Sequence, residues 1–379
     1  MTFQVLTFLM AFSGYFTAFI GTYTRRLPHV DGKGQGIYRA RLDPNTGALS
    51  NVTLAAELEN PTFLAIAPDQ KTLYAIAETE EFNGEFGGSV SAYAIDSATH
   101  TLTLLNRQPS RGGFACHLSL DATGRCAIVA NYGTGSVAAF PIEADGRLGS
   151  LSDFVQHAGS GPNAARQQGP HAHQAMLSPD NRFVFVNDLG ADQVMIYALD
   201  ATRGKLTSAG SAYVHPGAGP RHLDFHPNGR FAYVINELDA TLAAFRYDAA
   251  SGALTHIHTV PTLPPGATAP PSCADVHVHP NGCFVYGSNR NHDSIAIFAI
   301  DQATGRLTPI GHQPTQGGQP RNFALTPDGR FLLAENQDSD TVVSFRIDPE
   351  RGTLTPTGDV AHVPTPVCMK LLVHSKVNL

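Results

Sequence analysis

Short stretches of alternating apolar and polar residues recur along the whole chain. Six of them share one pattern, an apolar segment, a turn and a second apolar segment: LAIAPDQKTLYAIA, LSLDATGRCAIVA, MLSPDNRFVFV, LDFHPNGRFAYVI, VHVHPNGCFVYGS and FALTPDGRFLLAE. Turn residues flanked by β-branched and aromatic positions are typical of β-hairpins. A third apolar segment, such as SVSAYAI or SIAIFAI, follows each hairpin. The pattern therefore predicts antiparallel β-sheets built from strands that are adjacent in sequence.

A second motif lies between the hairpins and supplies the period. It is an acidic or polar turn followed by Leu and often Thr, as in PNTGALS or QATGRLT, and it occurs seven times, at Leu49, Leu102, Leu148, Leu206, Leu254, Leu307 and Leu354. Successive copies are 46 to 58 residues apart. A repeat of about 50 residues with four strands is the size of one β-propeller blade.

Six of these units are complete, and the seventh is divided between the two ends of the chain. We therefore expect an all-β fold, a seven-bladed β-propeller of four-stranded antiparallel blades. Strands within residues 16–51 and 365–373 are predicted to pair and close the ring, which removes exposed sheet edges. Residues 16–379 form a single domain in this interpretation, and residues 1–15 are an N-terminal extension.

Composition agrees with this division. A length of 379 residues alone suggests two or three domains, but the repeat reduces them to one. The 36 Gly and 26 Pro residues are explained by the repeated turns, and 42% hydrophobic residues exclude a disordered chain. A net charge of −7 argues against a nucleic-acid partner. No membrane partner is expected, and the oligomeric state is left open.

Cysteine use and the N-terminus bear on the compartment. Five cysteines without a CxxC pair indicate free thiols in a reducing environment, and hence a cytoplasmic protein. The first twenty residues are apolar, yet no Lys or Arg precedes Arg25. Because a signal peptide has a positively charged start, export is the alternative rather than the expectation.

Comparing equivalent positions across blades separates packing residues from candidate functional ones. Six residues before the hairpin turn, the blades carry Thr62, Cys116, His173, Arg221, Ala274 and Arg321. Beyond the end of the second strand they carry Glu78, Tyr132, Leu189, Glu237, Arg290 and Gln337. Strand starts and strand ends of a hairpin meet at one rim, so we expect His173, Arg221, Glu237, Arg290 and Arg321 to share one face. The simpler alternative is that they form ion pairs between blades.

The sequence gives less support to a metal site or a nucleotide-binding site. The pairs His171/His173, His256/His258 and His277/His279 each have a spacing that a metal can use. However, no third ligand is placed beside any of them, so we expect no metal and no other cofactor. GxSxG and P-loop motifs are absent from the sequence, which disfavours a hydrolase elbow and nucleotide binding.

The chain resembles a known family over nearly its whole length. The most specific segments are GPHAH, GPRHLDFHPNGRFAYVINEL, ADVHVHPNG with SNRN, and QPRNFALTPDGRFLLAENQ. They are similar to the seven-bladed propeller lactonases, a family that contains bacterial 6-phosphogluconolactonases and the fungal carboxy-cis,cis-muconate cyclase. The resemblance implies a site made of His173, Arg221, Glu237 and Arg290. GPRH and NEL are most similar to the phosphogluconolactonase branch.

The resemblance implies hydrolysis of 6-phospho-D-glucono-1,5-lactone to 6-phosphogluconate in the pentose phosphate pathway. Opening a lactone requires an activated water, stabilisation of an oxyanion and a proton for the departing ring oxygen. We assign Glu237 as the base and His173 as the acid, with exchanged roles as the alternative. Arg221 and Arg290 stabilise the oxyanion or hold the phosphate.

Three further residues are assigned to substrate binding. Arg321 and His222 are candidates for the phosphate, and His171 either contacts substrate or supports His173. Two other functions remain open: a muconate-type cyclase or another sugar lactonase, and a non-catalytic propeller that serves as an interaction platform.

Overall fold

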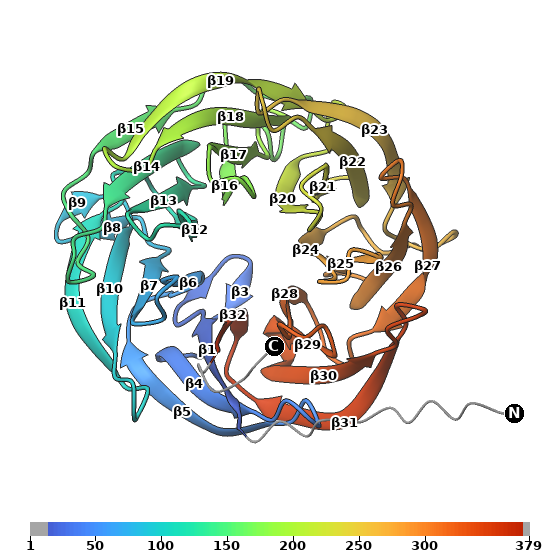
Figure 1. The fold of residues 1–379 in the computed structure, drawn as a ribbon, viewed down its shortest axis with the longest axis horizontal. Helices are drawn as coiled ribbons and strands as arrows, with labels where there is room; N and C mark the ends of the chain where they lie inside the picture. The colour runs from blue at the N-terminus through green and yellow to red at the C-terminus, as the bar shows by residue number, and fades with distance from the viewer. Residues whose placement is uncertain (1–13, 374–379) are drawn as a thin grey trace, which may run out of the picture.

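The structure, a computed structural model, describes residues 14–373 and is a ring of seven four-stranded antiparallel sheets (Figure 1). The predicted fold class is therefore confirmed. Apart from residues 14 and 15, the predicted N-terminal extension lies outside the described residues. No helix among residues 14–373 is long and apolar enough to span a membrane.

Each blade contributes one strand to each of four concentric layers, numbered here from the axis outward. The innermost strands are β32 (Pro366–Leu372), β6 (Leu64–Ile66), β12 (Ala115–Leu120), β16 (Ala172–Leu177), β20 (Pro220–Phe225), β24 (Cys273–Val278) and β28 (Pro320–Leu325). The second strands are β1 (Phe16–Thr22), β7 (Thr72–Ala77), β13 (Cys126–Asn131), β17 (Phe183–Asp188), β21 (Phe231–Asn236), β25 (Phe284–Asn289) and β29 (Phe331–Asn336).

The third strands are β4 (Gly36–Leu42), β10 (Ser89–Ile95), β14 (Ser136–Pro141), β18 (Gln193–Asp200), β22 (Thr241–Tyr247), β26 (Ser294–Ile300) and β30 (Thr341–Ile347). The outer strands are β5 (Leu49–Glu57), β11 (Leu102–Pro109), β15 (Asp153–Gln156), β19 (Lys205–Tyr213), β23 (Leu254–Pro261), β27 (Leu307–Pro314) and β31 (Leu354–His362). We number the blades 1 to 7, from the one containing β1 to the one containing β28.

Blade 1 joins the two ends of the chain, as the sequence predicted. Strand β1 lies between β32 and β4, and Phe19 is paired with Lys370 on one side and with Arg39 on the other. The residues that pair, 17–22 with 366–372, fall within the predicted closure segments. Because the C-terminal strand is the inner member of this blade, the ring closes without leaving a free edge between its first and last blades.

The hydrophobic core lies between neighbouring blades rather than in one central mass. Between blades 4 and 5, for example, the rings of Phe185, Phe225 and Tyr247 pack against one another with centroids 5.1–5.7 Å apart. Similar layers separate the other blades. Each sheet therefore buries both faces, and the axis is left for polar side chains.

The seven-fold turn motif links each blade to the one before it. Gly305 in blade 6 has a φ of +75°, and a Cβ there would lie 2.5 Å from the ring of Phe231 in blade 5. Tyr233 of blade 5 donates a hydrogen bond to the carbonyl oxygen of the same glycine at 3.2 Å. The same close approach occurs between Gly47 of blade 1 and Phe331 of blade 7. Both turns require a glycine, because a Cβ would collide with the phenylalanine ring of the preceding blade. The same contact is therefore used where blade 1 meets blade 7 and closes the ring.

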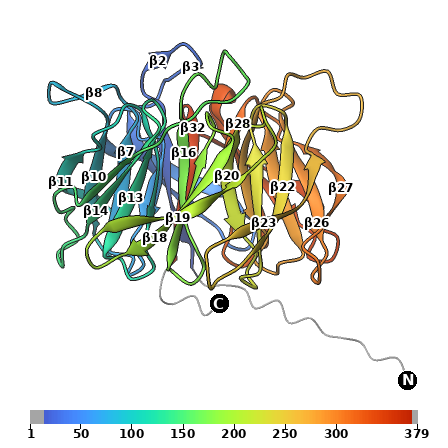
Figure 2. The same ribbon diagram turned by 90° about the horizontal axis from the view of Figure 1, so that it is seen from above.

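Additional hairpins stand above one face of the ring, here called the upper face. They are β2 (Arg26–Leu27) with β3 (Val30–Asp31), and β8 (Glu81–Phe82) with β9 (Glu85–Phe86) (Figure 2). A short 3-10 helix, η1 (Gln337–Ser339), follows β29. The β2–β3 hairpin carries the residues that partly cover the cavity described next.

Candidate active site

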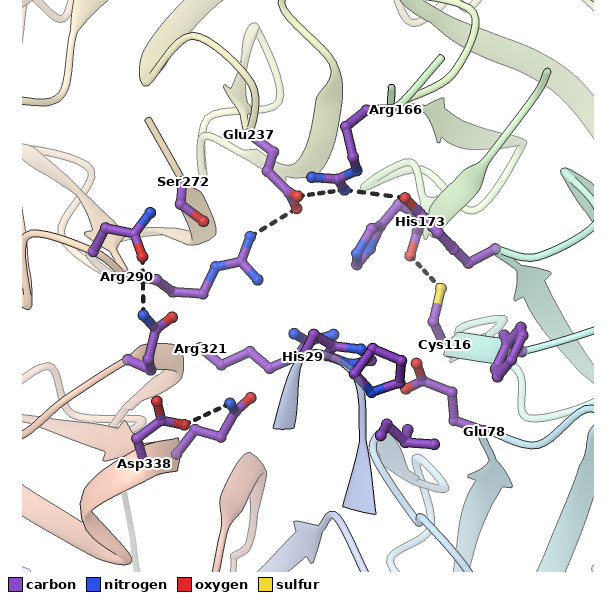
Figure 3. A pocket seen from close by; sticks show the side chains of 17 residues that line it. His29, Glu78, Cys116, Arg166, His173, Glu237, Ser272, Arg290, Arg321 and Asp338 are labelled. Carbon is purple, nitrogen blue, oxygen red and sulfur yellow. Dashed lines mark hydrogen bonds and ion pairs between the residues drawn. The ribbon is translucent and has the colours of Figure 1, made fainter. Parts of the chain in front are cut away.

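A cavity of about 670 Å³ opens at the upper face of the ring. Side chains from blades 2 to 7 line it, and the β2–β3 hairpin, which lies between β1 and β4 of blade 1, contributes Leu27, Pro28 and His29 (Figure 3). A closed ring that directs polar groups toward one space is a common setting for a ligand site. The cavity lies on the face where the sequence comparison placed its candidate residues.

Irregularities at the start of the inner strands contribute to this arrangement. In blades 3, 4, 5 and 7 the pairing register between inner and second strands shifts around Cys116, His173, Arg221 and Arg321, respectively. A β-bulge leaves one residue unpaired and turns its side chain away from the regular alternation. Cys116, His173 and Arg321 line the cavity, and Arg221 contacts a cavity carboxylate.

The ends of the second strands supply the other groups. Glu78, Tyr132, Glu237, Arg290 and Gln337, each one residue beyond the end of its second strand, line the cavity. The Leu189 position of blade 4 does not line it. Four of the five main predicted residues therefore line one cavity, and the fifth, Arg221, is hydrogen-bonded to a residue that does.

Glu237 is the electrostatic centre of the cavity because three arginines contact its carboxylate. Its Oε2 lies 3.0 Å from Nε of Arg221 and 2.8 Å from a terminal nitrogen of Arg290. Its Oε1 lies 2.7 Å from a terminal nitrogen of Arg166 (Figure 3). Arg221 is also held from the other side, since it donates a hydrogen bond of 2.5 Å to the carbonyl oxygen of Ala274.

These contacts determine the charge states of the cluster. Burial opposes ionisation of Glu237, but Arg290, Arg221 and Arg166 outweigh it and hold the pKa of this carboxyl well below its usual range. Burial and the neighbouring Arg290 lower the pKa of Arg221 to about 10. At neutral pH the cluster thus contains one carboxylate and three guanidinium cations.

His173 is the imidazole that an inner strand contributes to the cavity. It is 5% exposed, and its Nδ1 has no hydrogen-bond partner within residues 14–373. The thiol of Cys116 donates to the carbonyl oxygen of His173 at 3.2 Å, which fixes the backbone there. Burial and the positive charge of Arg221 hold the pKa of His173 well below its usual value. His173 is therefore a neutral imidazole at neutral pH.

Two predicted substrate-binding residues, His171 and His222, do not line the cavity. His171 stacks on Tyr132 with centroids 4.6 Å apart and supports that side of the cavity. His222 packs edge-on against His173, with ring centroids 5.2 Å apart, and its Nδ1 is 2.7 Å from Oδ1 of Asp275. These positions favour support of the lining residues, which is the simpler of the two interpretations given for His171.

Arg321 belongs to the inner strand of blade 7 and lines the cavity next to the blade that carries Arg290 (Figure 3). Its guanidinium carbon is 5.3 Å from the centre of the Tyr23 ring, and no hydrogen-bond acceptor among residues 14–373 contacts it. Burial opposes its charge, but Tyr23, Glu78 and Glu237 outweigh it and raise the pKa of Arg321. Arg321 is thus a cation whose donors are available to a bound anion.

Sequence reasoning missed Arg166 and His29. Arg166 lies in the loop between β15 and β16, where Gln167 is fully buried and donates a hydrogen bond to Asp192 at 2.7 Å. His29 lies at the tip of the β2–β3 hairpin, and burial together with Arg321 lowers its pKa to about 4. Both residues lie outside the repeat, so comparing blades could not reveal them.

The histidine pairs do not assemble a metal site. No group of three or more His, Cys, Asp and Glu side chains within the described part of the chain is arranged to hold a metal ion. His277, the first member of one pair, lies instead 3.0 Å from Oδ2 of Asp275 in a buried polar cluster around the axis.

Together, the closed ring and this cavity define a β-propeller with an arginine-rich candidate active site on its upper face. Residues 17–371 match the family described as lactonase, 7-bladed beta-propeller. The chain belongs to the seven-bladed β-propeller lactonase family, and the resemblance seen in the sequence is confirmed.

Individual relatives cover nearly the whole chain. It is 39% identical to a 6-phosphogluconolactonase of Bacillus subtilis over 357 residues, 94% of this chain and 98% of that protein. It is 35% identical to a 6-phosphogluconolactonase of Formosa agariphila, over 81% of this chain and 85% of that one. Among solved structures, a periplasmic gluconolactonase of Pseudomonas aeruginosa matches with a TM-score of 0.88 and 32% identity, over 95% of this chain and 99% of that chain.

Proposed function

We propose that the protein is a 6-phosphogluconolactonase, which hydrolyses 6-phospho-D-glucono-1,5-lactone to 6-phosphogluconate in the pentose phosphate pathway. The observation that carries the proposal is the cavity in which a neutral His173 lies with Arg290 and the Glu237 cluster. Lactone hydrolysis needs both a proton acceptor and cationic stabilisation of an oxyanion. The relatives named above support this choice of substrate.

His173 is best suited to move the proton. Its neutral imidazole accepts a proton from water as the water oxygen bonds to the lactone carbonyl carbon. The ring C–O bond then breaks, and the protonated His173 returns the proton to the departing ring oxygen. Proton and bond counts balance without a co-reactant, since the water supplies both the hydroxyl and the proton. Ring opening produces the C1 carboxylic acid, which releases its remaining proton to solvent and leaves a carboxylate beside the arginines.

Glu237 is less suited to act as a base. Three arginines already contact both of its oxygens, whereas Nδ1 of His173 has no hydrogen-bond partner among the described residues. We therefore favour the exchanged roles, with His173 as base and then acid. Glu237 orients Arg221 and Arg290, which stabilise the oxyanion.

Arg321 is the best candidate for the phosphate. Guanidinium groups bind phosphate oxygens through paired N–H donors, and those of Arg321 are unoccupied among the described residues. Arg166 is anchored on Glu237 and Tyr132, at 2.7 and 3.1 Å, and its side chain is 42% exposed. It therefore adds positive charge near the mouth of the cavity.

A second candidate substrate is the same lactone without its phosphate, because the Pseudomonas aeruginosa relative is a gluconolactonase. The available donors of Arg321 favour the phosphorylated substrate over it. A muconate-type cyclase would use the same arginines to bind carboxylates, and a non-catalytic platform would turn over no lactone. We place the enzyme in the cytoplasm, in agreement with its unpaired thiols.

The deciding experiment uses freshly generated 6-phosphogluconolactone, with formation of 6-phosphogluconate followed by a coupled oxidation. The folded protein is expected to accelerate hydrolysis well above the spontaneous rate, and more strongly than that of gluconolactone. A muconate-type substrate is assayed in parallel. Lactone hydrolysis no faster than the spontaneous rate would overturn the proposal.

A further inference from the structure

Glu78 is a second glutamate of the cavity, in the position of blade 2 that Glu237 occupies in blade 5. Both residues follow the second strand of their blade, and they lie on opposite sides of the cavity (Figure 3). Glu78 is 7% exposed. The proposed reaction, which requires an imidazole and arginines, does not use this carboxylate. Its place in the cavity therefore needs a separate explanation.

The partners of the two glutamates differ in kind. The Glu78 carboxylate receives hydrogen bonds from the hydroxyl of Tyr23, at 3.1 Å to Oε1 and 3.0 Å to Oε2, and from the hydroxyl of Thr62, at 2.6 Å to Oε2. Within residues 14–373 no guanidinium or ammonium group is hydrogen-bonded to it. Glu237, in contrast, is bound by three arginines.

The Glu78 carboxylate can accept hydrogen bonds in addition to those from the hydroxyls of Tyr23 and Thr62. A carboxylate has about four lone-pair directions, whereas Tyr23 and Thr62 supply two hydroxyl protons. Burial raises the pKa of Tyr23, so its hydroxyl keeps the proton that it donates. At least one direction on Oε1, an atom of a side chain that lines the cavity, has no donor among residues 14–373.

The backbone around Glu78 is firmly placed. Its N–H donates to the carbonyl oxygen of Asn60 at 3.0 Å, and the Asn60 side chain donates to the carbonyl oxygen of Glu78 at 3.2 Å. Asn60 also accepts hydrogen bonds from the backbone of Thr24 and Arg25, at 2.9 and 3.1 Å. The carboxylate is thus preorganised rather than carried on a free loop, as a specificity residue should be.

We propose that Glu78 determines specificity for a hydroxylated lactone ring by accepting hydrogen bonds from sugar hydroxyls. An anion held by the arginines directs the ligand into the cavity, and Glu78 selects carbon chains that carry O–H donors. A ligand with a carboxylate or only methylene groups at this place offers no donor and leaves Glu78 buried and incompletely bound. The inference rests on the proposed lactonase function and names the residue that recognises the sugar hydroxyls of the substrate.

The test measures binding of two non-reactive ligands with the same carbon number. Glucitol 6-phosphate carries hydroxyls, and hexyl phosphate does not. Calorimetric titration of the full-length Glu78→Gln protein should show about tenfold or greater loss of affinity for glucitol 6-phosphate. Its affinity for hexyl phosphate should be unchanged or higher, because a negative charge has been removed from the cavity.

The control variant is Asp338→Asn, which removes one carboxylate charge from the same cavity without altering Glu78. It should change the binding of both phosphates in the same direction and leave their affinity ratio within about threefold. If Glu78→Gln fails to fold, Glu78→Asp replaces it. Asp keeps the charge but withdraws the oxygens by one methylene, and it should also lose affinity for glucitol 6-phosphate selectively.

Equal changes for both ligands in the Glu78 variant would overturn the proposal, since Glu78 would then act only through its charge. With 6-phosphogluconolactone, Glu78→Gln should raise KM more than it lowers kcat. A hundredfold fall in kcat at unchanged KM would also overturn it, by making Glu78 part of the reaction. Absence of turnover in the wild-type protein would contradict the proposed function instead, and the binding measurements would still decide what Glu78 recognises.

Discussion

Replacing Glu237 by Gln tests the electrostatic centre of the cavity most directly. The change keeps the shape of the side chain but removes the charge that compensates Arg221 and Arg290. The side chains of Glu237 and Arg221 are 6% and 3% exposed, so their pair is buried. Removing one partner of a buried ion pair costs roughly 3 to 5 kcal/mol. We expect about 3 kcal/mol, because Gln still accepts one hydrogen bond and Arg166 can turn to solvent.

That loss corresponds to a measurable shift. Unfolding entropy scales with chain length at about 2 cal/mol/K per residue, so about 3 kcal/mol should lower Tm by roughly 4 °C in a chain of 379 residues. Differential scanning calorimetry at pH 7 measures it. The matched control is Glu59→Gln, which removes a surface ion pair with Arg25 at 3.2 Å and should leave Tm unchanged.

The pH dependence adds a second criterion. The pKa of Glu237 lies well below its ordinary value of 4.5, so its contribution to stability is complete above pH 4.5 and is lost as the pH falls toward the folded-state pKa. The Tm difference between wild type and Glu237→Gln should therefore be constant from pH 6 to 8 and narrow in acid. Equal Tm values at pH 7 would refute the described ion cluster.

Three further predictions concern the reaction and the ring. His173→Ala should lower kcat at least about a hundredfold. Because the pKa of His173 lies well below 6.5, wild-type activity should be level from pH 8 to 6.5 and fall only below pH 6.5. A midpoint above pH 7 in the rate profile would contradict this expectation. Arg321→Gln should raise KM for the phosphorylated lactone about tenfold or more while leaving KM for gluconolactone unchanged, and equal changes in steady-state assays would argue against a phosphate contact. Deletion of residues 365–379 removes β32 and opens blade 1, so circular dichroism should show loss of cooperative unfolding; a stable, active truncation would contradict ring closure by β32.

The fold was predictable from the sequence because its signals are local and repeated. A hairpin such as LDFHPNGRFAYVI specifies strand, turn and strand within thirteen residues, and the pattern recurs with a regular period. Ring closure followed from counting strands, since six complete units and two partial ones leave one blade to be shared by both ends. The glycine of the second motif was visible as a turn residue, but its contact with a phenylalanine of the preceding blade was not.

The site was predictable in part for a related reason. His173, Arg221, Glu237, Arg290 and Arg321 depart from their equivalents in other blades, and the repeat itself supplies the comparison that exposes them. Contacts could not be read in the same way. Three arginines contact Glu237 only because a bulge, a strand end and the loop before β16 converge in space. Because of these contacts, our proposal exchanges the roles that the sequence assigned to Glu237 and His173.

The sequence by itself therefore determined the seven blades, their closure and the face that carries the polar residues, because these depend on periodic local patterns. Tertiary structure alone decided which charges touch, that Arg166 and His29 join the cavity from irregular segments, and that hydroxyls surround Glu78 while three arginines surround Glu237. Charge state depends on burial and on neighbours distant in the chain. Neither burial nor contact between distant residues produces a periodic pattern in the sequence.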